Sequence, residues 1–282
     1  METKKKNTWF PYLLMLPSLL VMVVIVIYPI CNGIYTSFQQ EEKGGLGFEN
    51  YLYFLQDKNQ MASIVYTLEI VLVTVVLAIG LAYLLAIYLR FSDTKVSRAI
   101  GKLYLIPRFI PALVAVNGMI TIIRDSGLIN RVSQLFGLNI KLGLMYDAKG
   151  IVLMNLWFNI PFATMMLAAS LSALNNSEVE AARDAGASKM LIFRKLILPL
   201  TYRDLFVTAT FVFMSNISSF TTPYLMGTSY PRMMGVSLFE LYNNQHYGQA
   251  AALSVIMFLF SAVCAGMYIY VNMREDAWEK QA

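Results

Sequence analysis

Six long apolar stretches, separated by shorter polar segments, form the main pattern along the 282-residue chain. Each stretch has about the 20 residues that an α-helix needs to cross a bilayer. The stretches cover residues 12–35, 62–89, 103–123, 151–174, 205–222 and 250–272. This pattern predicts an all-α membrane protein with six transmembrane helices, in which residues 12–272 form the membrane domain.

The composition agrees with a membrane protein. Hydrophobic residues make up 57% of the chain and charged residues 14%, whereas soluble domains usually contain about 45–50% apolar residues. The formal net charge is +5, but the positive residues are spread over the loops and form no continuous face. The charge therefore indicates orientation in the membrane rather than binding to nucleic acid.

Lysine and arginine residues are distributed unevenly between alternate loops. If the N-terminus lies inside the cell, the cytoplasmic segments hold fifteen of these residues: Lys4, Lys5, Lys6, Arg90, Lys95, Arg98, Lys102, Arg108, Arg183, Lys189, Arg194, Lys195, Arg203, Arg274 and Lys280. The outer segments hold the other seven: Lys43, Lys58, Arg124, Arg131, Lys141, Lys149 and Arg232. Because cytoplasmic loops carry the excess of positive charge, we expect the termini, 1–11 and 273–282, and the segment 176–200 to be cytoplasmic.

Lysines at positions 4–6 precede the first apolar stretch, as basic residues do in a signal peptide. That stretch is longer than the apolar part of a usual signal peptide, and no small-residue cleavage site closes it. We therefore expect the first helix to be retained in a multi-pass protein of the inner or plasma membrane.

A charged segment, residues 176–200, separates the fourth and fifth stretches. Ser177 and Glu180 have the spacing of a capping box, which predicts a helix that begins near Asn176. Gly186 permits a sharp turn that residues with a β-carbon resist.

A second short helix is expected after this turn. It carries three basic residues, Lys189, Arg194 and Lys195. Pro199 is expected to end or kink it, because proline lacks the backbone donor and clashes with the preceding turn. Two short helices of this kind form a rigid knob that suits a groove on a soluble partner.

The same segment resembles the EAA motif of ABC-importer permeases. That motif reads Glu-Ala-Ala, three residues, Gly, nine residues, Ile, one residue and Leu-Pro, and Leu196 stands here where isoleucine is usual. The resemblance assigns coupling to an ATPase to the matching residues: Glu180, Ala181, Ala182, Gly186, Leu196, Leu198 and Pro199.

The resemblance covers nearly the whole chain and implies a type I, binding-protein-dependent importer. In such an importer a six-helix permease pairs with a second permease, identical or homologous. Two cytoplasmic ATPase subunits hydrolyse ATP, and an extracytoplasmic binding protein delivers the solute. The resemblance thus implies that the EAA-type loop between helices 4 and 5 passes the movement of the ATPases to the membrane helices.

The sequence offers no means of catalysis by this chain itself. It contains no Gly-x-x-x-x-Gly-Lys-Ser/Thr loop for nucleotide phosphates, so ATP is expected to be used by a partner subunit. The single histidine, His246, has no positioned partner for nucleophilic catalysis and no ligand neighbours at metal-site spacing. We expect a transport subunit with no catalytic residues, metal site or bound cofactor.

Three loop elements bear on the solute. Residues 48–51, Phe-Glu-Asn-Tyr, resemble the outer segment of sugar-class permeases and favour a sugar or oligosaccharide. Residues 227–231, Gly-Thr-Ser-Tyr-Pro, depart from the Gly-Gly-Pro loop that is common in that class. Residues 219–224 look closer to permeases for polyamines, phosphonates or metal ions, so a polyamine, a phosphonate or another small solute is the alternative.

Polar side chains recur in the fourth and fifth stretches, where unpaired polar groups in hydrocarbon are costly. Asn155 and Asn159 lie one turn apart on one face of a helix. Ser215 and Ser219 have the same spacing in the next helix. These stripes must meet each other or a solute, and two nearby aromatic rings could stack on a sugar. The predicted substrate path consists of Asn155, Trp157, Asn159, Ser215, Asn216, Ser219, Phe220 and Glu69.

Glu69 is the acidic residue that we place inside a predicted span. An ionisable residue in the membrane is a functional candidate, and the alternative role is a hydrogen bond between helices. An ion-gradient secondary transporter, or a membrane scaffold, is a further reading of the chain. Such carriers usually repeat their spans and carry charged coupling residues at mid-depth, for which Glu69 is the one candidate.

Small residues and prolines predict how two of the helices pack. Ala78, Ala82 and Ala86 follow one another at four-residue spacing, which lets another helix approach closely in lipid. In the third stretch, Pro107 and Pro111 each free a backbone carbonyl and predict kinks.

Overall fold

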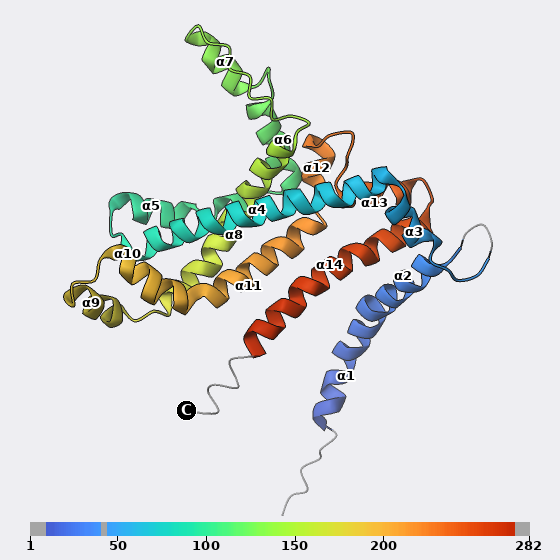
Figure 1. Cartoon of the computed structure of the whole chain (residues 1–282), viewed down its shortest axis with the longest axis horizontal. Helices are drawn as coiled ribbons and strands as arrows, with labels where there is room; N and C mark the ends of the chain where they lie inside the picture. The colour runs from blue at the N-terminus through green and yellow to red at the C-terminus, as the bar shows by residue number, and fades with distance from the viewer. Residues whose placement is uncertain (1–9, 41–43, 274–282) are drawn as a thin grey trace, which may run out of the picture. The chain divides into compact units, whose positions relative to one another are not determined.

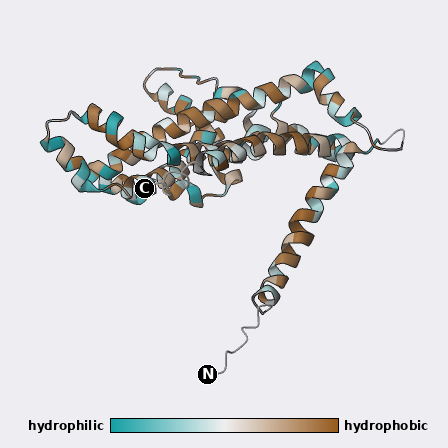
Figure 2. Cartoon of the chain, turned by 60° about the horizontal axis from the view of Figure 1, so that its bottom comes forward, coloured by the Kyte–Doolittle hydropathy of each residue, from teal (hydrophilic) through white to brown (hydrophobic). Residues whose placement is uncertain are grey.

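The computed structural model describes residues 10–40 and 44–273, and the regular elements assigned in these ranges are helices (Figure 1). Within this part of the chain, six helical segments are long and apolar enough to cross a bilayer. They are Leu14–Phe38, Lys58–Phe91, Ala112–Leu135, Ala148–Ser172, Lys189–Ile217 and Tyr247–Tyr270. Figure 2 shows hydrophobic residues along the long helices and hydrophilic residues mainly at helix ends and in loops. The predicted all-α fold with six spans is confirmed.

The predicted cytoplasmic termini, 1–11 and 273–282, lie almost wholly outside the described residues. The basic residues counted there for the orientation therefore have no structural description. The same holds for Lys43 in the loop after the first span.

The chain divides into two compact units. One unit comprises residues 1–60 and 238–256, and the other comprises 61–237 and 257–282. Three helices continue from one unit into the other: α4 (Lys58–Phe91), α13 (Met234–Asn243) and α14 (Tyr247–Met273).

In the first unit, polar contacts fasten α3 (Glu49–Gln56) to the end of α2 (Tyr28–Phe38). The Asn50 amide donates to the backbone carbonyls of Ser37 at 3.0 Å and Gln39 at 2.9 Å. The hydroxyls of Tyr51 and Ser37 lie 2.6 Å apart. In the sequence, the Phe-Glu-Asn-Tyr element is an indication of a sugar. In the structure, its Asn50 and Tyr51 hold α3 against the end of α2.

Two helices in the chain continue through a proline by widening the turn before it. A π-helical turn, Val23–Ile27, links α1 (Phe10–Met22) to α2, whose second residue is Pro29. A second π-helical turn, Phe193–Ile197, precedes Leu198-Pro199, and the Leu198 N–H donates to the carbonyl of Phe193. The wider turn avoids the steric clash that proline causes in a regular α-helix. Pro199 does not end the helix that precedes it, because the helical path continues from residue 189 to 217.

The core of the second unit lies where α4 packs on α8 (Ala148–Ser172) and α11 (Leu198–Ile217). Ala78, Ala82 and Ala86 are all fully buried in this cluster, which confirms the close approach that their spacing predicted. The larger members of the same buried cluster are Tyr83, Leu167, Leu171, Val179, Ile192, Ile197 and Val212.

The third predicted span, 103–123, differs most from the structure. The segment begins at the last residue of α5 (Lys95–Leu103) and contains a 3₁₀ turn (Ile106–Phe109) and α6 (Ala112–Ile123), after which α7 (Leu128–Leu135) follows. Pro107 lies in the first turn of the 3₁₀ helix, and Pro111 directly precedes α6. The prolines separate helices instead of kinking one, because proline is well accommodated only at the start of a helix.

The fifth predicted span, 205–222, is shifted in the structure. Helix α11 begins at Leu198 and ends at Ile217, and α12 (Thr221–Met226) follows a short break. Ser219 and Phe220 therefore lie outside the fifth helix, and the predicted stripe of Ser215 and Ser219 on one helix face is wrong.

Candidate coupling segment and translocation path

The first helix of the coupling segment, residues 176–200, is α9 (Asn176–Asp184). Its predicted start near Asn176 agrees with the structure, but the predicted capping box does not. Asn175 precedes the helix as its N-cap residue, so Ser177 already lies in the first turn. The Asn175 amide donates to the Glu178 carboxylate at 3.4 Å, two positions before the predicted pair of Ser177 and Glu180.

A Schellman motif ends α9 and explains the spacing between the alanines and the glycine. Gly186 adopts φ +83°, a left-handed conformation that glycine adopts without strain. The Gly186 N–H donates to the Arg183 carbonyl at 2.9 Å, and the Ala187 N–H donates to the Ala182 carbonyl at 3.1 Å. These two bonds satisfy helix carbonyls that would otherwise lack donors. The side chains of Ala182 and Ala187 both pack on the buried cluster.

The second helix of the coupling segment begins at once after this turn. The Ser188 hydroxyl accepts a hydrogen bond from the Leu191 N–H at 3.3 Å and caps α10 (Lys189–Ile192). The π-helical turn and α11 then continue the path without interruption. Sequence reasoning missed Ser188, although a serine directly before a helix is a recognisable cap.

The EAA-type residues divide into two groups by burial. Ala182, Leu196 and Leu198 pack against the buried cluster, whereas Glu180, Ala181, Gly186 and Pro199 are exposed. Between them, Val179, Ile192 and Ile197 are almost fully buried and anchor the segment to α4, α8 and α11. The motif therefore combines an anchoring side with an outward surface.

Arg90, at the end of α4, ties the coupling segment to the membrane helices. Its guanidinium donates to the carbonyls of Leu171 and Leu174, both at 3.2 Å, and to the Asn176 side chain at 2.6 Å. Leu171 lies in the last turn of α8 and Leu174 just beyond its end, where a positive charge is favourable. In Figure 1, α9 and α10 lie beside this end of α4. Sequence reasoning used Arg90 only for the orientation and missed this contact.

The outward surface of α10 also carries apolar side chains that the sequence did not single out. Met190 is 64% and Leu191 48% exposed. Basic residues flank them, because Lys189, Arg194 and Lys195 are exposed as well. An apolar centre with a charged rim is the usual anatomy of a protein-docking surface.

A polar seam, formed by Asn155, Asn159, Ser215 and Asn216, joins the middle of α8 to α11. The Asn159 amide donates to the Asn155 carbonyl at 2.7 Å and to the Asn216 side-chain oxygen at 3.2 Å. The Ser215 hydroxyl lies 3.5 Å from the Asn159 side-chain oxygen. The structure thus brings four of the predicted path residues together. In this conformation the polar side chains of α8 contact those of α11.

Two side chains of the predicted path on α8 take no part in these hydrogen bonds. The Asn155 amide nitrogen is buried and has no hydrogen-bond partner. Trp157, on the same helix, is 38% exposed. An unpaired buried donor costs free energy and calls for an explanation. Asn155 is thus the seam residue with spare hydrogen-bonding capacity.

The remaining aromatic candidate lies just beyond the end of α11. Phe220 stacks on Tyr224 with ring centroids 4.9 Å apart and an angle of 26° between the planes. The Ser219 N–H donates to the Asn216 carbonyl at 3.1 Å. Both residues therefore continue the seam at the break before α12, rather than on the face of α11.

Glu69 lies on an exposed face of α4, and no hydrogen bond from it to a seam residue is seen among the described residues. It lines a hollow of about 520 Å³ between α4 and α8, whose other walls are mostly apolar. Tyr66 and Lys149 also line this hollow. Among the described residues, no group of three His, Cys, Asp or Glu side chains could hold a metal ion.

Comparison with known proteins places the chain in a family. The family described as "Binding-protein-dependent transport system inner membrane component" matches residues 78–275. This match contains α8, α9, α10 and α11, and hence both the coupling segment and the polar seam.

Similar curated proteins are permease subunits of transport systems, which are transport components and not enzymes. The trehalose/maltose permease MalF of Thermococcus litoralis is 28% identical over 96% of both chains. The sulfoquinovosyl glycerol permease SmoG of Agrobacterium fabrum is 28% identical over 94% of this chain and 90% of its own. The spermidine/putrescine permease PotB of Escherichia coli is 24% identical over 90% and 93%.

Among solved structures, a bacterial alginate ABC transporter in complex with an alginate pentasaccharide-bound periplasmic protein has a chain with the same fold. The TM-score is 0.82, with 17% identity over 94% of both chains. Because the matched family covers well over half of the chain, and the fold agrees, the protein belongs to the family of inner membrane components of binding-protein-dependent transport systems.

Proposed function

We propose that this permease forms, together with a second identical or homologous permease, the path for a carbohydrate that an extracytoplasmic binding protein delivers. The observation that carries the proposal is the similarity over 96% of both chains to a permease named for trehalose and maltose. Family membership replaces the alternatives of an ion-gradient transporter or a scaffold.

The chemistry of the seam supports a neutral, hydroxyl-rich solute. Amides and hydroxyls can exchange hydrogen bonds with sugar hydroxyls, and Asn155 holds an unpaired donor at the seam. Trp157 and Phe220 supply aromatic faces near it. When α8 and α11 separate, the hydrogen bond between Asn159 and Asn216 breaks, and the two amide groups become available to the solute.

A polyamine is the second candidate, because the similarity to PotB covers most of both chains. A polycation calls for several carboxylates along its path, and the seam contains none. Glu69 lies on the hollow between α4 and α8 instead. The seam therefore favours the sugar over the polyamine.

The coupling segment accounts for how ATP hydrolysis on separate subunits acts on this path. In the proposed mechanism, the exposed surface around Glu180 and Met190 docks into a groove of a cytoplasmic ATPase subunit. Movement of that subunit then acts on α4 and α8 through Arg90 and the buried anchor. It reaches Ser215 and Asn216 through the uninterrupted helical path from 189 to 217.

The substrate class is tested with proteoliposomes that contain the permease pair and its ATPases. Binding protein loaded with maltose, trehalose or a longer oligosaccharide is expected to stimulate ATP hydrolysis and drive uptake. Asn155→Leu is expected to lower uptake while the amount of assembled complex stays the same. If only spermidine-loaded binding protein stimulated ATP hydrolysis, and sugar-loaded binding protein did not, the carbohydrate proposal would be overturned.

The orientation is tested in intact cells with a membrane-impermeant thiol reagent, after Cys31 and Cys264 are replaced by serine. A cysteine at Gly45 is expected to react, because the loop after the first span is proposed to lie outside. A cysteine at Asn176 is expected to react only after the cells are opened. The reverse pattern would place the coupling segment outside and remove the basis of the coupling mechanism.

A further inference from the structure

Helix α5 carries a basic stripe that the transport mechanism above does not use. Lys95, Arg98 and Lys102 are all exposed. At 100° per residue, their side chains fall within an arc of about 60° on the helix surface. Arg98 also contacts Asp93 at 3.3 Å, but both side chains are largely exposed, so this ion pair is weak.

A second stripe on the same helix is apolar and is not covered by the part of the chain that the structure describes. Val96 is 60% and Leu103 56% exposed, and Phe109, in the turn that follows, is 83% exposed. Ser97 is buried, and Gly101 faces Leu89 of α4, since a β-carbon at Gly101 would lie 3.7 Å from that side chain. The helix thus has a packed face, a basic face and an apolar face.

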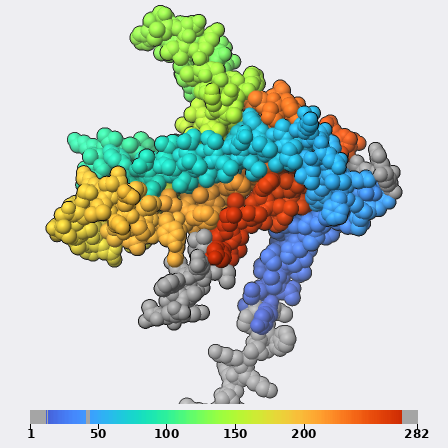
Figure 3. Space-filling view, viewed as in Figure 1, coloured from blue at the N-terminus to red at the C-terminus, as the bar shows by residue number. Residues whose placement is uncertain are grey.

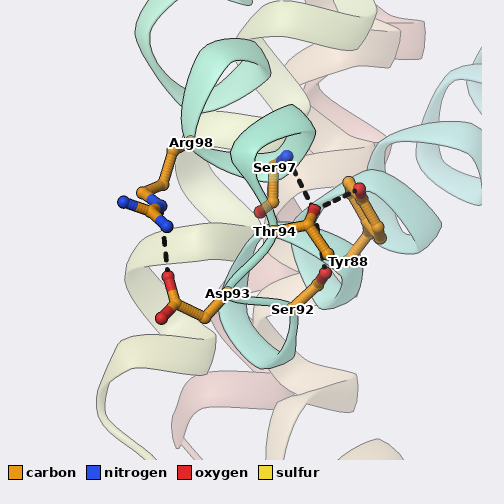
Figure 4. A network of polar contacts seen from close by, with 6 residues as sticks. All are labelled: Tyr88, Ser92, Asp93, Thr94, Ser97 and Arg98. Atoms are coloured by element: carbon orange, nitrogen blue, oxygen red, sulfur yellow. Dashed lines mark hydrogen bonds and ion pairs between the residues drawn. The ribbon is translucent and has the colours of Figure 1, made fainter.

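Local hydrogen bonds hold α5 against the end of α4. The Thr94 hydroxyl accepts from the Ser97 N–H at 3.1 Å and lies 3.0 Å from the Tyr88 hydroxyl, as Figure 4 shows. Ser92 donates to the same Thr94 oxygen at 3.4 Å. These contacts fix the direction in which the two free stripes point, so α5 needs no ligand to become ordered.

The position of α5 along α4 sets its depth in the membrane. Helix α4 has 34 residues, a length of about 51 Å at 1.5 Å per residue, whereas the hydrocarbon core is about 30 Å thick. A helix of this length extends beyond the hydrocarbon core, so its end with the charged Arg90 is expected in the headgroup layer. Figure 3 shows α5 on the surface beside that end of α4.

We propose that α5 is a docking site for anionic phospholipid, in which Lys95, Arg98 and Lys102 bind the lipid phosphates while Val96 and Leu103 insert among the acyl chains. The charges complement the phosphates, and the apolar stripe beside them matches the boundary between headgroups and acyl chains. The site would hold the α4–α5 corner, and with it Arg90, at a fixed depth. This inference concerns lipid alone and does not rest on the identity of the solute.

The test measures lipid contact at one position of α5 in the full-length protein. A bimane fluorophore is attached to a cysteine at position 103, after Cys31 and Cys264 are replaced by serine, and the protein is reconstituted in vesicles. Quenching by nitroxide-labelled phosphatidylglycerol is compared with quenching by nitroxide-labelled phosphatidylcholine. When the basic stripe is unchanged, we expect phosphatidylglycerol to quench the bimane fluorescence more strongly than phosphatidylcholine does.

Three charge variants make the result specific. The combination Lys95→Gln, Arg98→Gln and Lys102→Gln is expected to reduce the preference for phosphatidylglycerol by at least about fivefold, the effect of roughly one basic residue at an anionic surface. The swap Lys95→Arg, Arg98→Lys and Lys102→Arg keeps the charge and is expected to keep the preference. The matched control removes the same charge elsewhere and should change nothing: Arg124→Gln, Arg131→Gln and Lys141→Gln.

Three results would overturn the proposal. Equal quenching of the wild type by both lipids would show that the basic stripe selects no phosphate. A preference that persists in the triple glutamine variant would assign it to other residues. Quenching that disappears when the second permease or the ATPases are added would show that protein, not lipid, covers α5.

Discussion

The polar seam and the coupling segment orient their polar residues in opposite directions: inward in the seam and outward in the coupling segment. In the seam, Asn159 and Asn216 turn inward and bond to each other. In the coupling segment, Glu180 faces outward, while Val179 and Ile192 are buried. The seam is part of α8 and α11, and the coupling segment packs on the same two helices. The two regions therefore differ in the orientation of their polar side chains and not in the helices that support them.

The difference shows which polar residues are free to meet a partner. Asn159 and Asn216 can offer their side-chain amides to a solute only if the hydrogen bond between them is first broken, so their role depends on a change of conformation. A coupling residue such as Glu180 is available without any change. In the proposed mechanism, α8 and α11 therefore separate at the seam, and the coupling segment moves them from outside.

The largest effect is expected from Gly186→Val. A side chain at φ +83° is strained although nothing lies within 4 Å of the added β-carbon, and the left-handed conformation costs about 1–2 kcal/mol or more. The Schellman turn should open, and uptake should be abolished with the protein still inserted. Gly186→Asn is the control, because asparagine accepts this conformation. Normal uptake and ATPase association in the valine variant would sink the coupling role of the turn.

Arg90→Met is expected to have the next largest effect. It removes three hydrogen bonds from a charged donor, and because the side chain is half-buried we expect a loss of about 2–3 kcal/mol in total. Thermal unfolding should occur at lower temperature, and ATP hydrolysis should lose its dependence on the loaded binding protein. Arg90→Lys keeps the charge but not the planar fork, so it should recover little of the coupling. Full coupling in the lysine variant would show that Arg90 acts only through its positive charge, and that the geometry of its hydrogen bonds does not matter for coupling.

The two seam asparagines are expected to differ. Asn159→Leu leaves the Asn216 oxygen without its donor and should cost about 1–3 kcal/mol. Asn155→Leu removes a buried donor that has no partner, so its effect on unfolding should be close to zero or stabilising. If Asn155→Leu nevertheless lowers uptake, the residue belongs to the path. Unchanged uptake kinetics in both variants would assign the seam to packing alone.

The smallest effect is expected from Ser188→Ala, which removes the cap of α10. The loss should be about 0.5–1 kcal/mol, because the hydrogen bond is 3.3 Å long and exposed. Uptake should fall only in part. Ser188→Asp keeps an acceptor at the cap and should behave like the wild type, and a loss of uptake as severe as that of Gly186→Val would show that Ser188 itself touches the ATPase.

Much of the fold could be read from local pattern, but the fifth helix shows where this fails. Its prediction began at 205 because Tyr202, Arg203 and Asp204 make the preceding stretch polar. In the structure, Thr201 bonds to Tyr83 at 2.6 Å, and Asp204 accepts a hydrogen bond from Ser170. Other helices satisfy Thr201 and Asp204, which therefore lie within a helix that hydropathy alone starts too late.

The candidate site shows the same limit. The spacing of Ala182 and Gly186 was recognisable because a helix end and its glycine are neighbours in the chain. Arg90 was not, because its partners lie more than 80 positions away: the separation from Leu171 is 81 residues and from Asn176 86 residues. A basic residue at the end of a span looks the same in the sequence whether it faces water or clamps another helix.

By itself, the sequence determined the six spans, the helical class and the outline of the coupling segment, since hydrophobic length, helical period and turn residues act over a few neighbouring positions. Only the tertiary structure decided what each polar side chain in the membrane meets. Asn159 and Asn216 are 57 residues apart, and a hydrogen bond exists only where packing brings donor and acceptor within about 3 Å. Hydrophobicity selects the segments that enter the membrane, and packing selects the partners within it.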